Sequence, residues 1–458
     1  MTPFSWRAGL SSPLALVLFA VPAVAVLDAS AAETAGRART RVQAAPDAGP
    51  RAGREPAGGA VTRAGRVYYV DAREGDDDAS GAAPGKAWRS LAKASRARLR
   101  PGDALLFRRG GAWKGTLTLR GAGTEARPII VGGYGEGARP VISGRKGDCV
   151  LVEGSRLRVS DLRAHDCGWA GFRVDGRRND LRDVYADGNV AGVWVTERGA
   201  HNVIRNSRIV GNDRMSVDDD VADNDSGAFG VLLNGDDNHV IGNLIAGSYA
   251  PSHDYVYDGA AVEVYDGDRN VIARNVARDN ETFTELGHGP GGTAEDNLFA
   301  TNVVTSSHRR GSFLITRGPG HGVGPVEGTV AVGNSVYLSG RHTIGVSCAD
   351  GCSGGILTLR NNVIKVGGPV GFEDGKGVDD AGGVYDGRRG RFSPGDRSVR
   401  ADPRFRTRHD LRLRAGSPAI GQGVPLGPSW YGGAALAVDA VGRPIPRSKN
   451  PDAGAYQY

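Results

Sequence analysis

Val240-Ile-Gly-Asn243 and Val271-Ile-Ala-Arg-Asn275 belong to a set of short apolar patches that recur through the middle of the chain. Eight such patches occur, spaced 22 to 37 residues apart, and they begin at residues 159, 181, 203, 240, 271, 298, 330 and 359. Each patch is too short and too rich in β-branched residues for a helix. A repeat of this length buries its apolar side by stacking one strand per turn. The pattern therefore predicts an all-β fold, a single-stranded right-handed parallel β-helix, in which each coil of the solenoid contacts only its neighbours.

Length and composition agree with a secreted, loop-rich β protein. The chain has 458 residues, of which 71 are glycine and only 7% are aromatic, a profile unusual for helical domains. Residues 1–32 are predicted to form a secretory signal, with Arg7 before an apolar run that is too short to span a bilayer. Residues 33–65 have almost nothing to bury and are predicted to be a disordered linker. We therefore expect an extracellular protein, a monomer with no membrane span.

The formal net charge of +6 would ordinarily indicate an acidic partner, such as nucleic acid or a polyuronate. Many of the arginines fall in the signal, the linker and the terminal segments, where they are explained by solubility. We expect no nucleic-acid partner.

Four cysteines suit an oxidising compartment. Cys149 with Cys167, and Cys348 with Cys352, are candidate disulfide pairs, although the spacing leaves the connectivity open. The sequence contains no C-x-x-C pair, which argues against zinc.

The two ends of the folded part have their own patterns. Residues 87–99 place Trp88, Leu91, Ala92 and Leu99 on one helical face, and a helix there would cap the first coil and cover its strand edges. The predicted organisation is an N-terminal cap with the first coils, a central β-helix with loop insertions, and a closing segment, at residues 66–148, 149–400 and 401–458.

The stretch from Val67 to Gly144 resembles the opening segment of secreted proteins in the pectate-lyase-like β-helix superfamily. Ala401-Asp-Pro-Arg-Phe405 and Asp452-Ala-Gly-Ala-Tyr-Gln-Tyr458 are similar to its usual closing segment. The resemblance implies the fold and leaves the reaction open, because this superfamily contains lyases, hydrolases, epimerases and adhesins.

A second strand in each coil supplies the candidate site. Its flanking residues are apolar, so the middle residue of each strand is predicted to point outward. The predicted outward column contains Leu151, Arg173, Trp194, Leu232, Glu263, Glu285 and Leu314. Insertions at residues 215–229, 248–259, 287–292 and 306–312 are expected to form loops along one side of this column.

Glu263 and Glu285 lie 22 residues apart, which is one minimal coil. Stacked strands are about 4.8 Å apart. Two carboxyl groups about 5 Å apart serve as nucleophile and acid/base in retaining glycosidases. Mutual repulsion also raises one of the two pKa values, as a general acid requires. The alternative is that both glutamates are ordinary solvent-facing residues.

Residues 252–259 and the following strand add polar and aromatic groups beside Glu263. Asp258 is a candidate for orienting a water or hydroxyl in catalysis, and His253, Tyr255 and Tyr265 are candidates for substrate binding. Arg173 and Trp194, in the outward column, are also predicted to bind substrate. The alternative role of the residues in this insertion is to anchor the loop.

A polysaccharide lyase is the second functional hypothesis, implied by the resemblance. Lyases of this superfamily use a lysine or arginine base, often with Ca²⁺. No lysine occurs between Lys146 and Lys365, which leaves an arginine base, with Arg317 or Arg309-Arg310 as candidates and an ordinary surface arginine as the alternative for each. Asp218, Asp219 and Asp220 could supply oxygen ligands to Ca²⁺, although their spacing matches no defined calcium loop and a solvated acidic insertion is the alternative.

Asparagines that close the apolar patches are predicted to be structural, since stacked asparagines satisfy the backbone of tight turns. These residues are Asn206, Asn243, Asn275, Asn302 and Asn334.

The sequence as a whole favours a carbohydrate-active enzyme that cleaves the glycosidic bonds of a polysaccharide, of the glycoside-hydrolase type with a paired-glutamate site. This interpretation requires no cofactor. The lyase, with possible Ca²⁺ dependence, and a non-catalytic glycan-binding protein or adhesin remain as alternatives.

Overall fold

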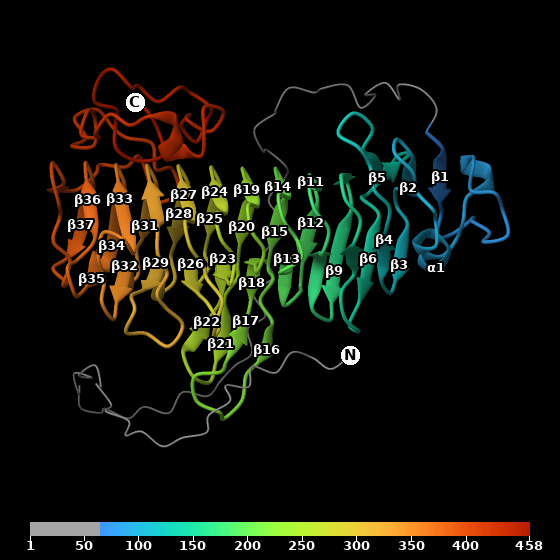
Figure 1. Ribbon diagram of the computed structural model, residues 1–458, viewed down its shortest axis with the longest axis horizontal. Helices are drawn as coiled ribbons and strands as arrows, with labels where there is room; N and C mark the ends of the chain where they lie inside the picture. Colours follow the sequence, from blue (N-terminus) through green and yellow to red (C-terminus); the bar gives the residue numbers. More distant parts are fainter. Residues whose placement is uncertain (1–64) are drawn as a thin grey trace. The chain divides into compact units, whose positions relative to one another are not determined.

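The computed structural model describes residues 65–458, which form a parallel β-helix built from three long sheets (Figure 1). Each full coil contributes one strand to each sheet, and neighbouring strands in a sheet come from successive coils. The prediction of an all-β solenoid is confirmed. The predicted signal, residues 1–32, lies outside the described residues, as does the linker up to residue 64. No helix in the described part is long and apolar enough to cross a membrane.

Within each sheet, every strand pairs with the strand named before it. Sheet A contains β1 (Val67–Val70), β2 (Ala104–Arg108), β5 (Ile129–Tyr134), β8 (Leu157–Ser160), β11 (Asp180–Arg182), β14 (Val203–Arg205), β19 (His239–Ile241), β24 (Val271–Ala273), β27 (Leu298–Ala300), β30 (Thr329–Val332), β33 (Leu357–Arg360) and β36 (Asp379–Ala381). Sheet B contains β3 (Ala112–Lys114), β6 (Val141–Gly144), β9 (Arg163–Cys167), β12 (Tyr185–Asp187), β15 (Arg208–Val210), β20 (Leu244–Ala246), β25 (Val276–Arg278), β28 (Val303–Ser306), β31 (Ser335–Leu338), β34 (Val363–Pro369), β37 (Val384–Arg388) and β38 (Val399–Arg400). Sheet C contains β4 (Leu117–Leu119), β7 (Val150–Val152), β10 (Ala170–Val174), β13 (Ala191–Val195), β18 (Phe229–Leu233), β23 (Ala260–Tyr265), β26 (Thr282–Gly287), β29 (Arg310–Arg317), β32 (His342–Ala349) and β35 (Gly371–Glu373).

The apolar patches form sheet A, and the residue that faces the core is not at the same position in every patch. Leu181 and Val240, the first residues of their patches, pair with Ile204 and Ile272, which are the second residues of theirs. In the patches that begin at residues 203 and 271, the second residue therefore faces the core. Where the second residue faces the core, the first residue of the patch is apolar because of a contact on the outer face. Val271 and Leu298 pack from outside against the C-terminal segment, which makes both faces of these strands apolar.

The C-terminal segment lies along the side of the solenoid, beside the ends of β27, β33 and β36 (Figure 1). Its one short helix, η2 (Pro428–Tyr431), places Tyr431 in an apolar cluster with Ala300 and Val332 of sheet A. A second cluster joins Phe405 to Val363 of sheet B. Residues 401–458 thus cover the outer surfaces of two sheets.

The N-terminal helix is present but much shorter than the predicted 87–99. The 3₁₀ turn η1 (Pro84–Lys86) precedes α1 (Leu91–Ser95), whose first turn is capped by the Ser90 hydroxyl accepting the Lys93 N–H at 3.1 Å. Trp88 forms a β-bridge to Val70 instead of joining the helix. Ala94, rather than the exposed Ala92, completes the buried face.

Buried asparagines stack along the solenoid, as predicted. The Asn275 side-chain oxygen accepts the Asn243 backbone N–H at 2.9 Å, and the Asn275 amide donates to the Val240 carbonyl at 2.8 Å. The row continues through buried residues at each coil: Asn302, Asn334 and Asn362. Asn206 was wrongly assigned to this row. It is exposed, and Ser207 takes the equivalent position.

A second asparagine row, at another turn, was not predicted. Each member accepts the backbone N–H of the preceding one at 2.9 Å, and the row consists of Asn179, Asn202, Asn238, Asn270 and Asn297. Two rows of amide contacts therefore fix how one coil sits on the next.

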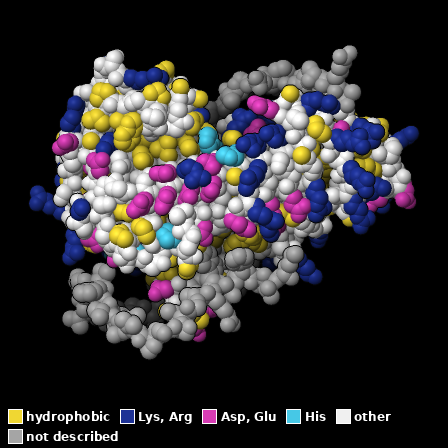
Figure 2. Space-filling view, in the orientation of Figure 1, with side chains coloured by type: hydrophobic (Ala, Val, Ile, Leu, Met, Phe, Trp, Pro, Cys, Tyr) yellow, Lys and Arg dark blue, Asp and Glu magenta, His cyan; other side chains and the backbone are white. Residues whose placement is uncertain are grey.

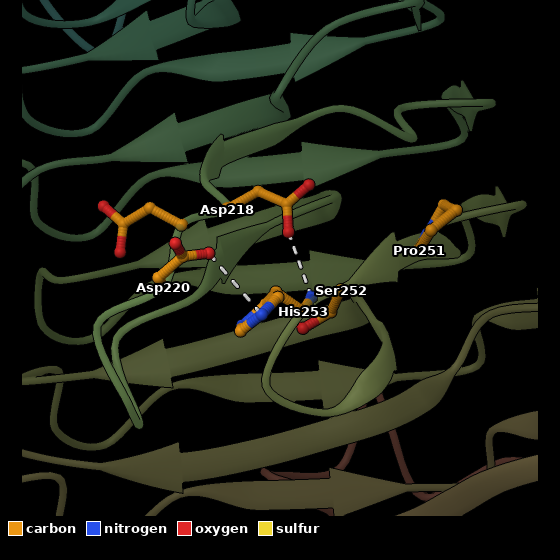
Figure 3. A pocket seen from close by; sticks show the side chains of 6 residues that line it. Asp218, Asp220, Pro251, Ser252 and His253 are labelled. Atoms are coloured by element: carbon orange, nitrogen blue, oxygen red, sulfur yellow. Dashed lines mark hydrogen bonds and ion pairs between the residues drawn. The ribbon is translucent and has the colours of Figure 1, made fainter.

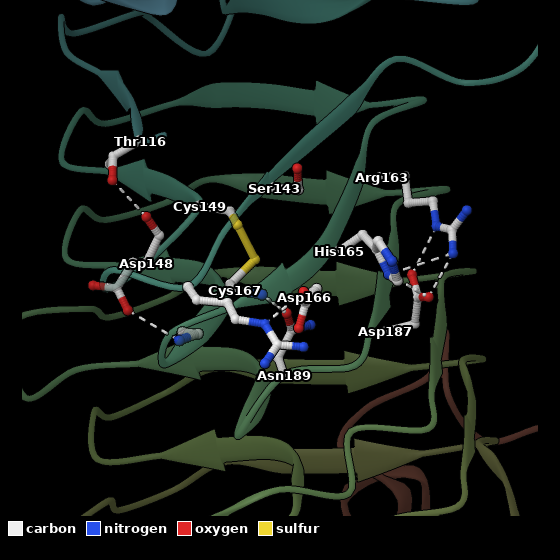
Figure 4. The surroundings of a disulfide bond; sticks show 12 residues. Thr116, Ser143, Asp148, Cys149, Arg163, His165, Asp166, Cys167, Asp187 and Asn189 are labelled. Carbon is white, nitrogen blue, oxygen red and sulfur yellow. Dashed lines mark hydrogen bonds and ion pairs between the residues drawn. A yellow bond between two sulfur atoms is a disulfide. The ribbon is translucent and has the colours of Figure 1, made fainter. Parts of the chain in front are cut away.

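Both candidate disulfides are formed, and Figure 4 shows the one between Cys149 and Cys167. Cys149 and Cys167 join the start of β7 to the end of β9 within one coil, and the Cys167 N–H donates to Asn189 at 2.9 Å. Cys348 and Cys352 close a short loop after β32.

Two of the predicted insertions are hairpins that lie side by side at the edge of sheet C (Figure 1). The first contains β16 (Met215–Val217) and β17 (Ser226–Gly227), and the second contains β21 (Ala250–Ser252) and β22 (Val256–Asp258). The buried Asp225 carboxylate joins them by accepting the Ser252 hydroxyl at 2.7 Å and the Asp254 N–H at 2.9 Å.

Replacing one member of the asparagine row should destabilise the whole solenoid. We expect Asn275→Ala to lower the free energy of unfolding by about 2–4 kcal/mol, because several buried backbone and amide groups lose their partners. Chemical denaturation followed by circular dichroism measures this. Asn206→Gly is the matched control, since Asn206 is exposed with φ 50°, a conformation that glycine adopts freely. Equal stability of the two variants would contradict the structural role.

Candidate active site

Glu263 on β23 and Glu285 on β26 are direct partners in the parallel register of sheet C. Their neighbours in the strands, Val262 paired with Thr284 and Val264 paired with Leu286, are buried. Because side chains alternate along a strand, both glutamates point away from the core on the outer face. The predicted register, which places Glu263 beside Glu285 on successive coils, is confirmed.

The outward column is also as predicted up to Glu285, since Arg173, Trp194, Leu232 and Glu263 pair in order. Beyond Glu285 the prediction is wrong by one residue. Ile315 pairs with Glu285, whereas Leu314 pairs with Thr284 and is fully buried. The reason lies inside the coil, where the Phe283 and Phe313 rings stack with centroids 5.5 Å apart and set the register of the two strands.

Arg317, at the end of β29, distinguishes the two glutamates. Its guanidinium forms an ion pair with Glu285 and also donates to the Leu286 carbonyl at 2.8 Å. The Glu263 carboxyl lies in a different environment. Burial raises its pKa well above the usual value, and the negative charges of Glu285 and Asp258 raise it further, with Arg317 opposing the effect. Glu263 therefore retains its proton where an ordinary glutamate would lose it.

Asp258 ends the second hairpin and lies close to the glutamate pair. Burial raises its pKa to about 7, assisted by the charges of Glu285 and Glu281, while the Gly259 N–H, which donates to it at 2.7 Å, acts in the opposite direction. The structure thus brings Asp258 together with Glu263 and Glu285, as the sequence predicted for this candidate.

Glu281 is a further carboxyl group that was not predicted. Burial raises its pKa to about 7, and it accepts the Thr282 hydroxyl at 2.5 Å. The negative charge of Glu285 raises the pKa of Glu281 further, whereas the positive charge of Arg310 lowers it. Glu281 immediately precedes β26, and the sequence signal that could have found it is its place four residues before Glu285.

Two tyrosines flank the carboxyl groups. Burial raises the pKa of Tyr255 to about 12, with added effects from aspartates of the hairpins and from Glu285, yet 43% of the residue is exposed. Burial likewise raises the pKa of Tyr265 to about 12, and Asp266 and Glu263 contribute. Both phenols are therefore neutral hydrogen-bonding groups at physiological pH.

Arg173 and Trp194 lie further along the column. The Arg173 guanidinium lies 4.8 Å from the Trp194 ring centroid and donates to Asp175 at 2.9 Å. The Trp194 indole donates to Asn234 at 2.6 Å, and the Trp169 ring meets it edge-on. These contacts hold both side chains in place on the outer face, and their predicted role in substrate binding remains a prediction.

His253 and the Asp218–Asp220 run line a shallow pocket of about 350 Å³ on the two hairpins (Figure 3). Asp218 accepts the His253 backbone N–H at 3.0 Å, and the His253 ring lies 3.6 Å from the Asp220 carboxylate. The three aspartates do not converge. Across residues 65–458 no group of three or more His, Cys, Asp or Glu side chains has an arrangement that would hold a metal ion. The geometry gives no support to the predicted Ca²⁺ site.

Comparisons with known proteins agree with the architecture. A family model described as the right-handed β-helix region matches residues 148–382. Among curated proteins, none matches this chain. The solved structure of the pectate lyase Pel9A is similar, with a TM-score of 0.57 and 14% sequence identity over 87% of this chain and 98% of that one. A complex of XylC with xylose has a TM-score of 0.51 and 9% identity, covering 86% and 98% of the two chains. At these identities the similarity concerns the fold alone.

The elevated pKa of Asp258 predicts how stability depends on pH. The folded state holds this proton more tightly than the unfolded state, so the wild type loses stability as the pH rises from about 4 to about 7. Asp258→Asn removes this loss. We expect the variant to gain about 2–4 kcal/mol relative to the wild type between these pH values, measured by denaturation at each pH.

Asp220→Asn is the control for this experiment, because Asp220 belongs to the neighbouring hairpin and its side chain is 99% exposed. Its stability relative to the wild type should stay constant with pH. If the stability of Asp258→Asn relative to the wild type is also independent of pH, Asp258 is not a desolvated carboxyl group.

Proposed function

The chain belongs to the right-handed β-helix family, and from that premise we propose that it is a secreted carbohydrate-active enzyme that hydrolyses glycosidic bonds of a polysaccharide. The observation that carries the proposal is the Glu263–Glu285 pair, aligned on successive coils and placed in contrasting environments. Adjacent strands are about 4.8 Å apart, close to the carboxyl separation of about 5–5.5 Å in retaining glycosidases.

The proposed mechanism assigns one role to each glutamate. Glu263, which retains its proton, gives that proton to the glycosidic oxygen as the bond to the anomeric carbon breaks. Glu285, ion-paired with Arg317, attacks the anomeric carbon and forms a glycosyl ester. In the second step Glu263 takes a proton from water, the resulting hydroxide equivalent attacks the anomeric carbon, and Glu285 is released as a carboxylate. No cofactor is needed.

Arg317 and Asp258 would support these roles without bonding to the sugar. The Arg317 guanidinium holds and neutralises the Glu285 carboxylate before attack. The negative charge of Asp258, when ionised, keeps the proton on Glu263. Tyr255, Tyr265 and the more distant Trp194 offer rings and hydroxyls to neighbouring sugars, which is how protein sites commonly hold glycans.

Elimination by a lyase has weaker support from the geometry. An arginine base must lose its proton, but the Arg317 guanidinium is ion-paired with Glu285 and donates to a backbone carbonyl. Both contacts occupy its N–H groups with acceptors of the protein itself. A non-catalytic adhesin would not require two adjacent carboxyl groups with such different surroundings.

Substitution of either glutamate should abolish turnover. On any glycan that the protein cleaves, we expect Glu263→Gln and Glu285→Gln each to lower kcat by at least about 100-fold, because one removes the acid and the other the nucleophile. Release of reducing ends measures the rate. Glu327→Gln, an exposed glutamate outside the site, should retain wild-type activity. Full activity in both site variants would exclude this assignment.

The products distinguish the two reactions. Hydrolysis adds one water to each cleaved bond, so the summed product mass should exceed that of the substrate by one water per cut. Elimination adds none and creates a conjugated double bond that absorbs in the ultraviolet. Mass spectrometry of products from a broad glycan panel is expected to show water addition, and an unsaturated product would favour the lyase.

A further inference from the structure

A pocket of about 490 Å³ lies between sheet B and the C-terminal segment, and we call it the basic pocket. Sheet B contributes Tyr337 of β31 and Lys365 of β34, which are partners in the parallel register. The other lining residues belong to the C-terminal segment, between residues 402 and 415. Pockets that hold small ligands have volumes of about 300–1,000 Å³. The basic pocket therefore has the size of a binding site, and it is built on a different sheet from the candidate active site.

Three arginines line the basic pocket: Arg404, Arg408 and Arg414. Each is bonded to an uncharged group of the protein. Arg404 donates to the Gly416 carbonyl at 3.1 Å, Arg408 donates to the His409 ring at 3.0 Å, and Arg414 donates to another backbone carbonyl. None of these three guanidiniums is ion-paired with a carboxylate of residues 65–458. The protein thus orients them without neutralising them.

The carboxylates nearby are paired with other cations. Asp402, the one acidic residue that lines the basic pocket in the described chain, lies 2.8 Å from the Lys365 ammonium. Asp386 binds the same ammonium at 2.9 Å. Arg412, which does not line the pocket, forms an ion pair with Asp410 at 2.6 Å. The positive charges of the three lining arginines are therefore left for a ligand.

Polar groups beside the arginines suit a sugar. Asp402 uses one oxygen, Oδ1, to accept both the Lys365 ammonium and the Arg404 N–H, so its Oδ2 can accept a sugar hydroxyl. The Thr407 hydroxyl accepts the Asp410 N–H at 2.9 Å and keeps its own proton to donate. The pocket therefore offers both hydrogen-bond donors and acceptors in addition to its charge.

The rings in the floor of the basic pocket are less suited to a nucleic-acid base. A base needs an open aromatic face on which to stack. Phe405 is buried, and its ring centroid lies 6.4 Å from that of Tyr337. The Lys365 ammonium lies over the Tyr337 ring, 5.7 Å from its centroid. Hydrogen bonding to a charged sugar is thus favoured over base stacking.

The charge of the molecule is unevenly distributed. Figure 2 shows Lys and Arg side chains towards both ends of the face drawn, and Asp and Glu side chains frequent over the coils between them. At physiological salt, exposed charges act over only about 8 Å. Three arginines around one pocket therefore attract an anion more strongly than the same number scattered over the surface.

We propose that the basic pocket binds the anionic group of an acidic glycan, a carboxylate or a sulfate carried on a sugar. The planar guanidinium matches these groups through paired N–H donors. Binding there would hold the protein on an acidic polymer through the C-terminal segment. The proposal is independent of the hydrolysis assigned to sheet C, because neither Glu263 nor Glu285 takes part.

Two matched pairs of polymers test the proposal, and the members of each pair differ only in the anionic group. They are polygalacturonate with its methyl ester, and dextran sulfate with dextran. Isothermal titration calorimetry of the full chain at about 0.15 M salt measures the affinities. We expect the charged member of at least one pair to bind at least about tenfold more tightly than the neutral one, and the pair concerned identifies carboxylate or sulfate.

The double variant Arg404→Gln/Arg414→Gln should lower this affinity at least about tenfold, because two charged hydrogen-bond donors are lost. The control Arg158→Gln/Arg182→Gln removes the same charge from exposed positions of β8 and β11, several coils away, and should lower it less than about twofold. Arg408→Gln, whose side chain bonds only to the adjacent His409, gives a second test with little risk to folding. We expect it to lower the affinity about threefold.

Equal losses in the pocket variants and the control would overturn the proposal, since net charge alone would then explain binding. Failure of both acidic polymers to bind would overturn it as well. A short DNA duplex that binds more tightly than either polymer, and loses that binding in the pocket variants, would assign the pocket to nucleic acid instead. The hydrolysis proposed for Glu263 and Glu285 is unaffected by any of these results.

Discussion

The parallel register between successive coils is the constraint on which the rest of this structure depends. Buried asparagines maintain it at two turns, because each side-chain oxygen accepts a backbone N–H from the neighbouring coil. Since every coil is stacked with the same register, a side chain on one strand of sheet C lies directly beside its partner on the next. The solenoid can therefore place two carboxyl groups on adjacent strands even though the fold does not require the pair.

This placement opposes stability locally. Like charges on adjacent strands repel, and burial of Asp258, Glu263 and Glu281 disfavours their ionised forms. The disulfide between Cys149 and Cys167, the asparagine rows and the C-terminal segment packed on two sheets all lie elsewhere and hold the scaffold rigid. A rigid scaffold that tolerates unfavourable electrostatics at one place is what a preorganised catalytic site requires.

The differences between the sequence interpretation and the structure have separate physical causes. Val271 is the first apolar residue of its patch, yet it packs against the C-terminal segment, whereas Ile272 pairs with the core residue Val240. Leu314 was assigned to the outer column, while stacking of Phe283 on Phe313 shifts that strand by one position. Glu281 was not predicted, because its burial depends on the folded chain around it and not on its own stretch of sequence.

The sequence by itself determined the solenoid, the pairing of Glu263 with Glu285 and the asparagine row, because these features follow from a repeat with a strand period of two. Only the tertiary structure decided which glutamate is ion-paired and which keeps its proton, since that depends on Arg317 from the next coil and on Asp258 from an insertion. Periodicity specifies which residues are neighbours along the stack. Burial and charge at a given point arise from segments that the repeat does not contain.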